Sequence, residues 1–205
     1  MWLNLPNSLS LFRVAVVPAL MVFMLVESRA GDIIALCLFL AAVASDFLDG
    51  YIARRRRQTS VLGVFLDPLA DKLLVTAALV SLVQLSQLSA WVAMIVIARE
   101  LAVSGLRMVA ASQNLVIAAS IWGKVKTTAQ MVAIAALLMG PRWIEARWEV
   151  WGSRVIWYLV ILMLILTVVS GVHYFVRAGS KLRGHLASSA TRQSAERVPA
   201  GSGKE

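Results

Sequence analysis

The chain is poor in the residues that most often build crosslinks and soft metal sites. Of its 205 residues, one is cysteine and two are histidine. A single cysteine, Cys37, excludes both an intrachain disulfide and a thiolate metal cluster. His173 and His185 have no acidic or cysteine neighbour at ligand spacing, which favours packing or surface roles over catalysis. Any metal site would therefore have to use oxygen ligands.

Acidic residues are also scarce, with 11 Asp and Glu against 20 Lys and Arg and a formal net charge of +9. A basic excess of this size can indicate nucleic-acid binding. Here, however, the basic residues fall at the ends of apolar segments, as they do in the cytoplasmic loops of membrane proteins. We therefore expect the lipid bilayer as a partner and no nucleic acid.

Hydrophobic residues make up 60% of the chain and gather into long runs. About 20 apolar residues in a helix are enough to cross a bilayer. Six runs of roughly this length occur, at residues 9–26, 33–53, 61–85, 90–111, 116–140 and 151–176. We therefore expect an all-α integral membrane protein, a bundle of six transmembrane helices. The sequence shows no internal repeat, which argues against transporters built from paired halves.

The segments outside these runs indicate the topology. Residues 1–9 carry no cationic region and no cleavage site, so we expect a short interfacial segment that leads into an uncleaved anchor. Four arginines at 54–57 follow the second run, which places that connection, both chain termini and the active site in the cytoplasm. A membrane domain at 1–183 should precede a disordered cytoplasmic tail at 184–205, which is rich in Ser, Ala, Gly and charge.

Four aspartates lie in the second and third apolar runs, where an ionised group near the bilayer centre costs about 2.5 to 3.5 kcal/mol. Asp46 and Asp49 share one face of a helix. Gly63, Asp67 and Asp71 recur at every fourth position of the next helix. If the two stripes meet, their oxygens suit Mg²⁺ or Mn²⁺, and a two-metal site suits phosphoryl transfer. Fold-stabilising ion pairs with the arginines at 54–57 or with Lys72 are the alternative.

The aspartates belong to a longer pattern between Asp46 and Asp71, D-x2-D-G-x2-A-R-x8-G-x3-D-x3-D. This pattern resembles the signature of the CDP-alcohol phosphotransferase family at every fixed position. Three further segments are similar to bacterial members of that family whose acceptor is glycerol 3-phosphate: residues 4–13 with Pro18, 97–100 with Arg107, and 123–131. The resemblance covers about residues 1–140.

The resemblance implies transfer of a phosphatidyl group from CDP-diacylglycerol to glycerol 3-phosphate, by a homodimer in the bacterial cytoplasmic (inner) membrane. It implies that Asp46, Asp49 and Asp67 hold two Mg²⁺ ions, with Mn²⁺ as an alternative. Asp71 would complete the second metal site and act as the general base. Residues at positions that contact the CDP-lipid in the family are Gly50, Ala53, Arg54, Ser60, Gly63, Asn7 and Ser10.

Basic residues inside or at the edges of the fourth and fifth runs require anions as partners. These residues are Arg99, Arg107, Lys124 and Lys126. Guanidinium groups bind phosphate in a bidentate manner, whereas lysine acts as a point charge. We predict that the four residues bind the acceptor phosphate, with the stronger case for Arg107 and Lys124. The alternative is an internal salt bridge between Arg107 and Glu100, which lies on nearly the same helical face.

Other functions remain open at this point. Within the same family, inositol phosphate, serine or another alcohol could replace glycerol 3-phosphate. A divalent-cation transporter would need acids distributed along a permeation path, whereas these cluster beside the arginines at 54–57. An aspartate-rich intramembrane prenyltransferase also binds diphosphate through Mg²⁺, but its acid motifs lack the spacing of Gly50, Ala53, Arg54 and Gly63.

Overall fold

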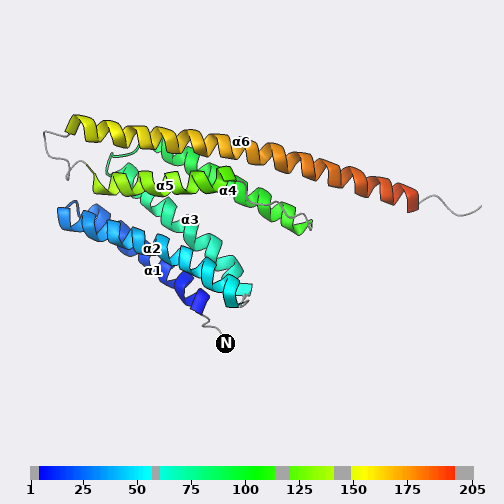
Figure 1. Cartoon of the computed structure of the whole chain (residues 1–205), viewed down its shortest axis with the longest axis horizontal. Coiled ribbons are helices and arrows are strands. Elements are labelled where there is room, and N and C mark those ends of the chain that lie inside the picture. Colours follow the sequence, from blue (N-terminus) through cyan, green and yellow to red (C-terminus); the bar gives the residue numbers. More distant parts are fainter. Residues whose placement is uncertain (1–4, 57–60, 114–120, 141–148, 197–205) are drawn as a thin grey trace, which may run out of the picture.

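The structure is a computed structural model that describes residues 5–56, 61–113, 121–140 and 149–196. Side chains are described at 11–46, 69–113, 121–140 and 152–180. Within these ranges the chain forms six helices and no strand, which confirms the all-α prediction (Figure 1). The helices are α1 (Leu5–Leu25), α2 (Arg29–Arg56), α3 (Val61–Gln84), α4 (Ala90–Ser112), α5 (Ile121–Met139) and α6 (Glu149–Glu196).

Each predicted apolar run contains one of these helices, but their hydropathy is unequal. Among the described side chains, one segment of α6, Gly152–Ser180, is both long and apolar enough to cross a membrane, with 29 residues and a mean hydropathy of 2.6. Leu11–Leu25 of α1 is apolar but shorter. In α4 and α5, charged side chains interrupt the apolar sequence. Six membrane crossings therefore stay a prediction.

The N-terminal end differs from the expectation of a separate interfacial segment. Helix α1 begins at Leu5, so residues 5–9 are its first turns and not an element of their own. Pro6 is tolerated there because the N–H groups in the first turn of a helix have no partner within the helix. Residues 1–4 lie outside the described chain.

The C-terminal end also differs, because α6 continues to Glu196 where we expected no regular structure after residue 183. The sequence there contains good helix formers such as Ala, Arg and Gln, and no proline interrupts it before Pro199. This part of α6 extends past the ends of the other helices (Figure 1). Where the membrane domain ends stays a prediction, since the side chains after Ser180 are not described.

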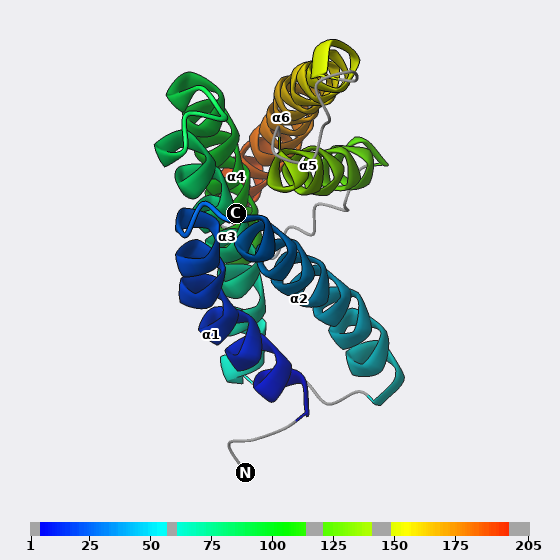
Figure 2. The same ribbon diagram turned by 90° about the vertical axis from the view of Figure 1, so that its left-hand side faces the viewer.

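The helices pack in two groups that share one core. Helix α1 packs against both α2 and α3, and α6 packs against both α4 and α5. Contacts of α2 with α5 and of α3 with α4 join the groups. Figures 1 and 2 show α1 and α2 on the lower side of the bundle and α5 and α6 on the upper side. Fully buried core residues come from both groups: Leu20, Phe39, Ala78, Leu79, Ile134 and Met163.

The position of α1 matters for the predicted carboxylate site. Helices α2 and α3, which carry the aspartates, touch each other, but each packs more extensively on α1. Small residues in the shared core, Ala35 and Ala42 on α2 and Ala78 on α3, are fully buried, and small residues allow helices to approach closely. A side chain on α1 can therefore reach the acidic faces of both neighbours.

Candidate active site

A buried arginine of α1 contacts the first aspartate of the pattern. The Nη1 atom of Arg13 lies 3.1 Å from Oδ1 of Asp46 on α2. The arginine side chain is 1% exposed, whereas the Asp46 side chain is 52% exposed. The guanidinium is therefore inside the bundle, while the carboxylate that it holds still faces outward.

Asp71 of α3 belongs to the same electrostatic neighbourhood. Its carboxylate interacts with the charges of Asp46, Arg13, Lys72 and Lys126. The structure thus brings Asp46 and Asp71 from two different helices to one region, while the meeting of the complete acidic stripes stays a prediction. Asp71 is half-buried, so its side chain is not fully enclosed in the bundle.

The structure describes the side chains of two of the four predicted metal ligands, Asp46 and Asp71. Asp49 and Asp67 lie in α2 and α3, but their side chains are not described. The described side chains contain no group of three or more acidic, histidine or cysteine ligands. Asp46 and Asp71 do supply hard oxygen donors, the first of them on a half-exposed side chain, and this donor chemistry suits Mg²⁺ or Mn²⁺. The residues present therefore fit a divalent metal, and the complete ligand set stays a prediction.

For the residues predicted to bind the CDP-lipid, the structure describes the backbone at most and no side chain. Asn7 and Ser10 lie in the first turns of α1, and Ser10 precedes Arg13 by three residues, close to one turn of helix. Gly50, Ala53 and Arg54 occupy the last turns of α2, and Gly63 the first turn of α3. Ser60 lies outside the described residues. Their contacts to a CDP-lipid stay predictions.

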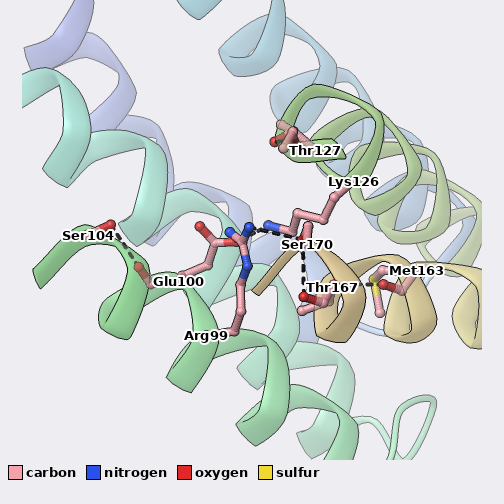
Figure 3. Close-up of polar contacts among 9 residues, drawn as sticks. Arg99, Glu100, Ser104, Lys126, Thr127, Met163, Thr167 and Ser170 are labelled. Atoms are coloured by element: carbon pink, nitrogen blue, oxygen red, sulfur yellow. Dashed lines mark hydrogen bonds and ion pairs between the residues drawn. The ribbon is translucent and has the colours of Figure 1, made fainter. Parts of the chain in front are cut away.

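The cationic residues gather around Glu100 of α4. The ammonium group of Lys126 on α5 donates a hydrogen bond to the Glu100 carboxylate (Figure 3). Arg99 Nη1 lies 3.4 Å from Glu100 Oε1, and Arg99 Nη2 donates to Ser170 Oγ of α6 at 3.0 Å. One carboxylate and its two cations therefore connect α4, α5 and α6.

Arg99 also packs closely against α6. A Cβ atom at Gly171 would lie 3.2 Å from Arg99 Cγ, so a larger residue there would push the arginine aside. The Ser170 hydroxyl that accepts from Arg99 donates in turn to the Thr167 carbonyl at 3.1 Å. With its proton directed at the Thr167 carbonyl, the Ser170 oxygen offers its lone pairs to Arg99. The position of this guanidinium is set by both packing and hydrogen bonding.

The other two predicted acceptor residues are more accessible. Arg107 of α4 is exposed, and its Cζ lies 5.9 Å from the ring centroid of Tyr174 on α6, which is cation–π range. Lys124 at the start of α5 is exposed as well. The alternative salt bridge between Glu100 and Arg107 is wrong, since the described carboxylate of Glu100 pairs with Arg99 and Lys126. Lys126 is buried and therefore needs the carboxylate more than the exposed Arg107 does.

Two lysines join the acidic and cationic groups into one region. Lys126 is close enough to Asp71 to be attracted by its charge and close enough to Arg99 to be repelled. Lys72 likewise is attracted by Asp71 and repelled by Arg107. A ligand that bridges the two groups would place a metal-binding part beside the aspartates and an anionic part beside the arginines. Such an arrangement suits the transfer of one phosphate-containing group to another.

Sequence reasoning missed the contacts of several residues in this region, although it named Glu100 as a possible partner of Arg107. Arg13 and Glu100 carried a usable signal, because an ionisable residue within an apolar run is functional by default. Ser170 and Tyr174 carried none, because polar and aromatic residues are ordinary in an apolar helix. Only the packing of α6 on α4 shows that these two side chains contact the arginines.

Comparisons with known proteins agree with this chemistry. The sequence model of the CDP-alcohol phosphatidyltransferase family matches residues 3–172. Three relatives, all named CDP-diacylglycerol--glycerol-3-phosphate 3-phosphatidyltransferase, come from Bacillus subtilis, Rickettsia bellii and Haemophilus influenzae. The first is 40% identical over 88% of this chain and 97% of its own length. The Rickettsia bellii relative is 33% identical over 84% of this chain and 93% of its own length. The Haemophilus influenzae relative is 42% identical over 66% of this chain and 75% of its own length. With most of its length matched, the chain belongs to the CDP-alcohol phosphatidyltransferase family.

Proposed function

We propose that the protein transfers a phosphatidyl group from CDP-diacylglycerol to the primary hydroxyl of glycerol 3-phosphate. The products are phosphatidylglycerophosphate and CMP. The observation that carries this proposal is the single charged region in which Lys126 interacts with Asp71 and also binds Glu100 beside Arg99. Such a region has one end for a metal-bound diphosphate and another for an acceptor phosphate. The names of the three relatives support the same donor and acceptor.

The reaction makes one bond and breaks one. The acceptor hydroxyl oxygen attacks the phosphorus that carries the diacylglycerol, and a new P–O bond forms. The phosphoanhydride bond breaks, and CMP leaves with the bonding electron pair. The hydroxyl proton passes to the carboxylate of Asp71, the proposed general base. A base in hydrogen-bond reach of the hydroxyl contributes about 10²- to 10⁴-fold to the rate.

The four aspartates would hold the divalent ions that such a reaction requires. Asp46, Asp49, Asp67 and Asp71 together balance the charge of two Mg²⁺ ions, and Mn²⁺ has the same preference for oxygen ligands. When bound, the ions supply charge neutralisation for the diphosphate and for the departing CMP. The half-exposed side chain of Asp46 and the half-buried position of Asp71 are compatible with this role.

The substrates would occupy opposite ends of the region. Gly50 and Ala53 leave room on α2 for the CDP group, and Arg54 can bind its diphosphate. Further CDP-lipid contacts are proposed for Asn7, Ser10, Ser60 and Gly63. The phosphate of glycerol 3-phosphate would bind Arg107 and Lys124, which are exposed, and then Arg99 and Lys126, which Glu100 holds in place.

We further propose six membrane crossings in the bacterial inner membrane, with both termini and the active site on the cytoplasmic side. Large apolar side chains are exposed on several helices, as lipid contact requires: Val22, Trp91, Met94, Trp157, Ile165 and Phe175. The arginines at 54–57 support the cytoplasmic placement of the site. The membrane domain would span residues 1–183 and work as a homodimer, which crosslinking in native membranes tests.

The test is CMP release by the purified full-length protein in detergent, with CDP-diacylglycerol and Mg²⁺. Reactions with glycerol 3-phosphate, inositol phosphate, serine or no acceptor are compared. We expect release that depends on both Mg²⁺ and glycerol 3-phosphate. Faster release with another alcohol would overturn the acceptor assignment while keeping the family. Absence of release with every acceptor, together with Mg²⁺ uptake into liposomes, would favour a cation transporter instead.

A further inference from the structure

Arg13 is a charged residue in a place where the fold alone would favour an apolar one. It lies on the face of α1 that also carries the core residues Val16 and Leu20, and it is 1% exposed. Burying a guanidinium is expensive unless ionised or hydrogen-bonding partners surround it. An apolar side chain of similar volume would stabilise such a core at least as well. The presence of arginine therefore calls for a reason beyond packing.

The partner of Arg13 supplies that reason. Its Nη1 atom lies 3.1 Å from Oδ1 of Asp46, whose side chain is 52% exposed. A pair that served only to neutralise charge inside the bundle would be buried at both ends. Here the cation is buried and the carboxylate faces outward. The arginine thus pairs with one oxygen of a carboxylate that stays half exposed and is accessible to a ligand.

The same guanidinium acts on the second described aspartate. The charge of Arg13 reaches Asp71 as well as Asp46, and these two carboxylates repel each other. This geometry follows from the fold, because α1 packs against both α2 and α3. Arginine suits the position better than lysine, since its broad, delocalised and permanently charged guanidinium can face two carboxylates at once.

We propose that Arg13 is a positioning residue of the metal site: it fixes the Asp46 carboxylate and offsets the repulsion between Asp46 and Asp71. This inference rests on the proposed function, since it assumes that the aspartates bind divalent ions. Arg13 acts through Asp46 and does not touch the reacting atoms. Residues that orient metal ligands typically change metal affinity or activity by about 10- to 100-fold when they are replaced.

The test measures Mn²⁺ binding to the full-length protein by electron paramagnetic resonance, without either substrate. We expect Arg13→Met to weaken Mn²⁺ binding by about 10- to 100-fold. Arg13→Lys keeps the charge but replaces the broad guanidinium with a compact ammonium group, so it should weaken binding to a smaller but measurable extent. The control is Leu20→Ala, which opens a cavity on the same buried face of α1 two turns away. It should lower the unfolding temperature and leave Mn²⁺ affinity unchanged.

The outcomes separate this inference from the proposed function. Wild-type Mn²⁺ affinity in both Arg13 variants would overturn the positioning role, and so would an equal loss of affinity in Leu20→Ala. If Arg13→Met does not fold, Arg13→Lys decides alone. The CMP-release assay on the wild-type protein is run in parallel. Failure of that assay overturns the proposed function, whereas normal release combined with unchanged Mn²⁺ affinity in the variants overturns only the role of Arg13.

Discussion

The two ends of the charged region are built on opposite schemes. On α1, α2 and α3, the carboxylates of Asp46 and Asp71 gather around a buried cation, Arg13. On α4, α5 and α6, the cations of Arg99 and Lys126 gather around a carboxylate, Glu100. Each end thus contains a residue of opposite charge: Arg13 of α1 at the acidic end and Glu100 of α4 at the cationic end.

The difference between the ends indicates what each one lacks. The sequence adds Asp49 and Asp67 to the acidic end, and Arg107 and Lys124 to the cationic end. The internal counter-ions do not cancel the four like charges of either end, and a bilayer interior makes the remaining imbalance costly. Divalent cations would balance the excess negative charge of the acidic end, and a phosphate dianion would balance the excess positive charge of the cationic end. The internal counter-ions then keep each end assembled before its ligand arrives.

Asp71→Asn should have the largest effect, because it removes the proposed base from the acidic end. We expect CMP release to fall by about 10²- to 10⁴-fold, the usual contribution of a general base. The amide keeps the shape of the side chain, so CDP-diacylglycerol should still raise the unfolding temperature of the variant. Activity within a few-fold of wild type would show that Asp71 is not the base.

Glu100→Gln should have the next largest effect, because it removes the counter-ion of the cationic end. Lys126 is 3% exposed at its side chain and would lose the carboxylate that it donates to. Breaking a buried ion pair costs about 3 to 5 kcal/mol, and we expect about 2 to 3 kcal/mol here because Glu100 is 24% exposed. Thermal unfolding in detergent measures the loss.

Inorganic phosphate sharpens this prediction. If phosphate completes the cationic end, it should raise the unfolding temperature of Glu100→Gln more than that of the wild type, because the carboxylate no longer occupies Lys126. Ser104→Ala is the matched control, since among the described contacts the Ser104 hydroxyl donates to the backbone carbonyl of Glu100, at 2.7 Å, and to no charged side chain. An identical response to phosphate in all three proteins would contradict a phosphate site at this end.

The helices themselves were predictable from local sequence, and their ends were less so. An apolar run of bilayer length must satisfy its backbone hydrogen bonds internally, which makes it helical. This reasoning placed one helix in each of the six runs. It failed after residue 183, where α6 continues to Glu196 through polar sequence. Polar composition indicates the absence of a core, but it does not prevent Ala, Arg and Gln from forming helix.

The partners of the charged residues were not predictable, because they depend on which helices touch. Helical periodicity pairs Glu100 with Arg107, one of its neighbours on the same helix. The structure pairs it instead with Lys126 of α5 and with the adjacent Arg99. In the same way, nothing local to the aspartate pattern points to Arg13, which is reached only because α1 packs against both α2 and α3. Local spacing therefore indicates candidate site residues, whose roles stay predictions, but it does not reveal which counter-ions contact them.

Arg107→Met should have a smaller effect, confined to the acceptor. The exposed guanidinium above Tyr174 is the proposed first contact of the acceptor phosphate. Losing one charge-assisted contact of about 1.5 kcal/mol should raise the KM for glycerol 3-phosphate roughly tenfold, with kcat little changed. Arg177→Met is the control, since this exposed arginine lies on α6 and takes no part in the proposed site. A fall in kcat without a change in KM would place Arg107 outside the acceptor site.

Ser170→Ala should have the smallest effect, because it removes a neutral partner from an arginine that other contacts also hold. The lost bond is the one from Arg99 Nη2 to Ser170 Oγ, 3.0 Å long. A cost of about 1 kcal/mol should lower the unfolding temperature by about 2 to 4 °C. The matched control on the same helix is Ser180→Ala, whose hydroxyl donates to the Arg177 carbonyl and to no other helix among the described contacts.

The pair of serine variants separates two ways of holding Arg99. If the hydrogen bond from α6 fixes the guanidinium, only Ser170→Ala should lower the unfolding temperature, and it should also raise the KM for glycerol 3-phosphate slightly. If the unfolding temperature falls equally in both serine variants, the close contact between Arg99 Cγ and Gly171 holds the arginine instead. In that case Gly171→Ala, which adds a Cβ atom 3.2 Å from Arg99 Cγ, should disturb the cationic end more than either serine variant does.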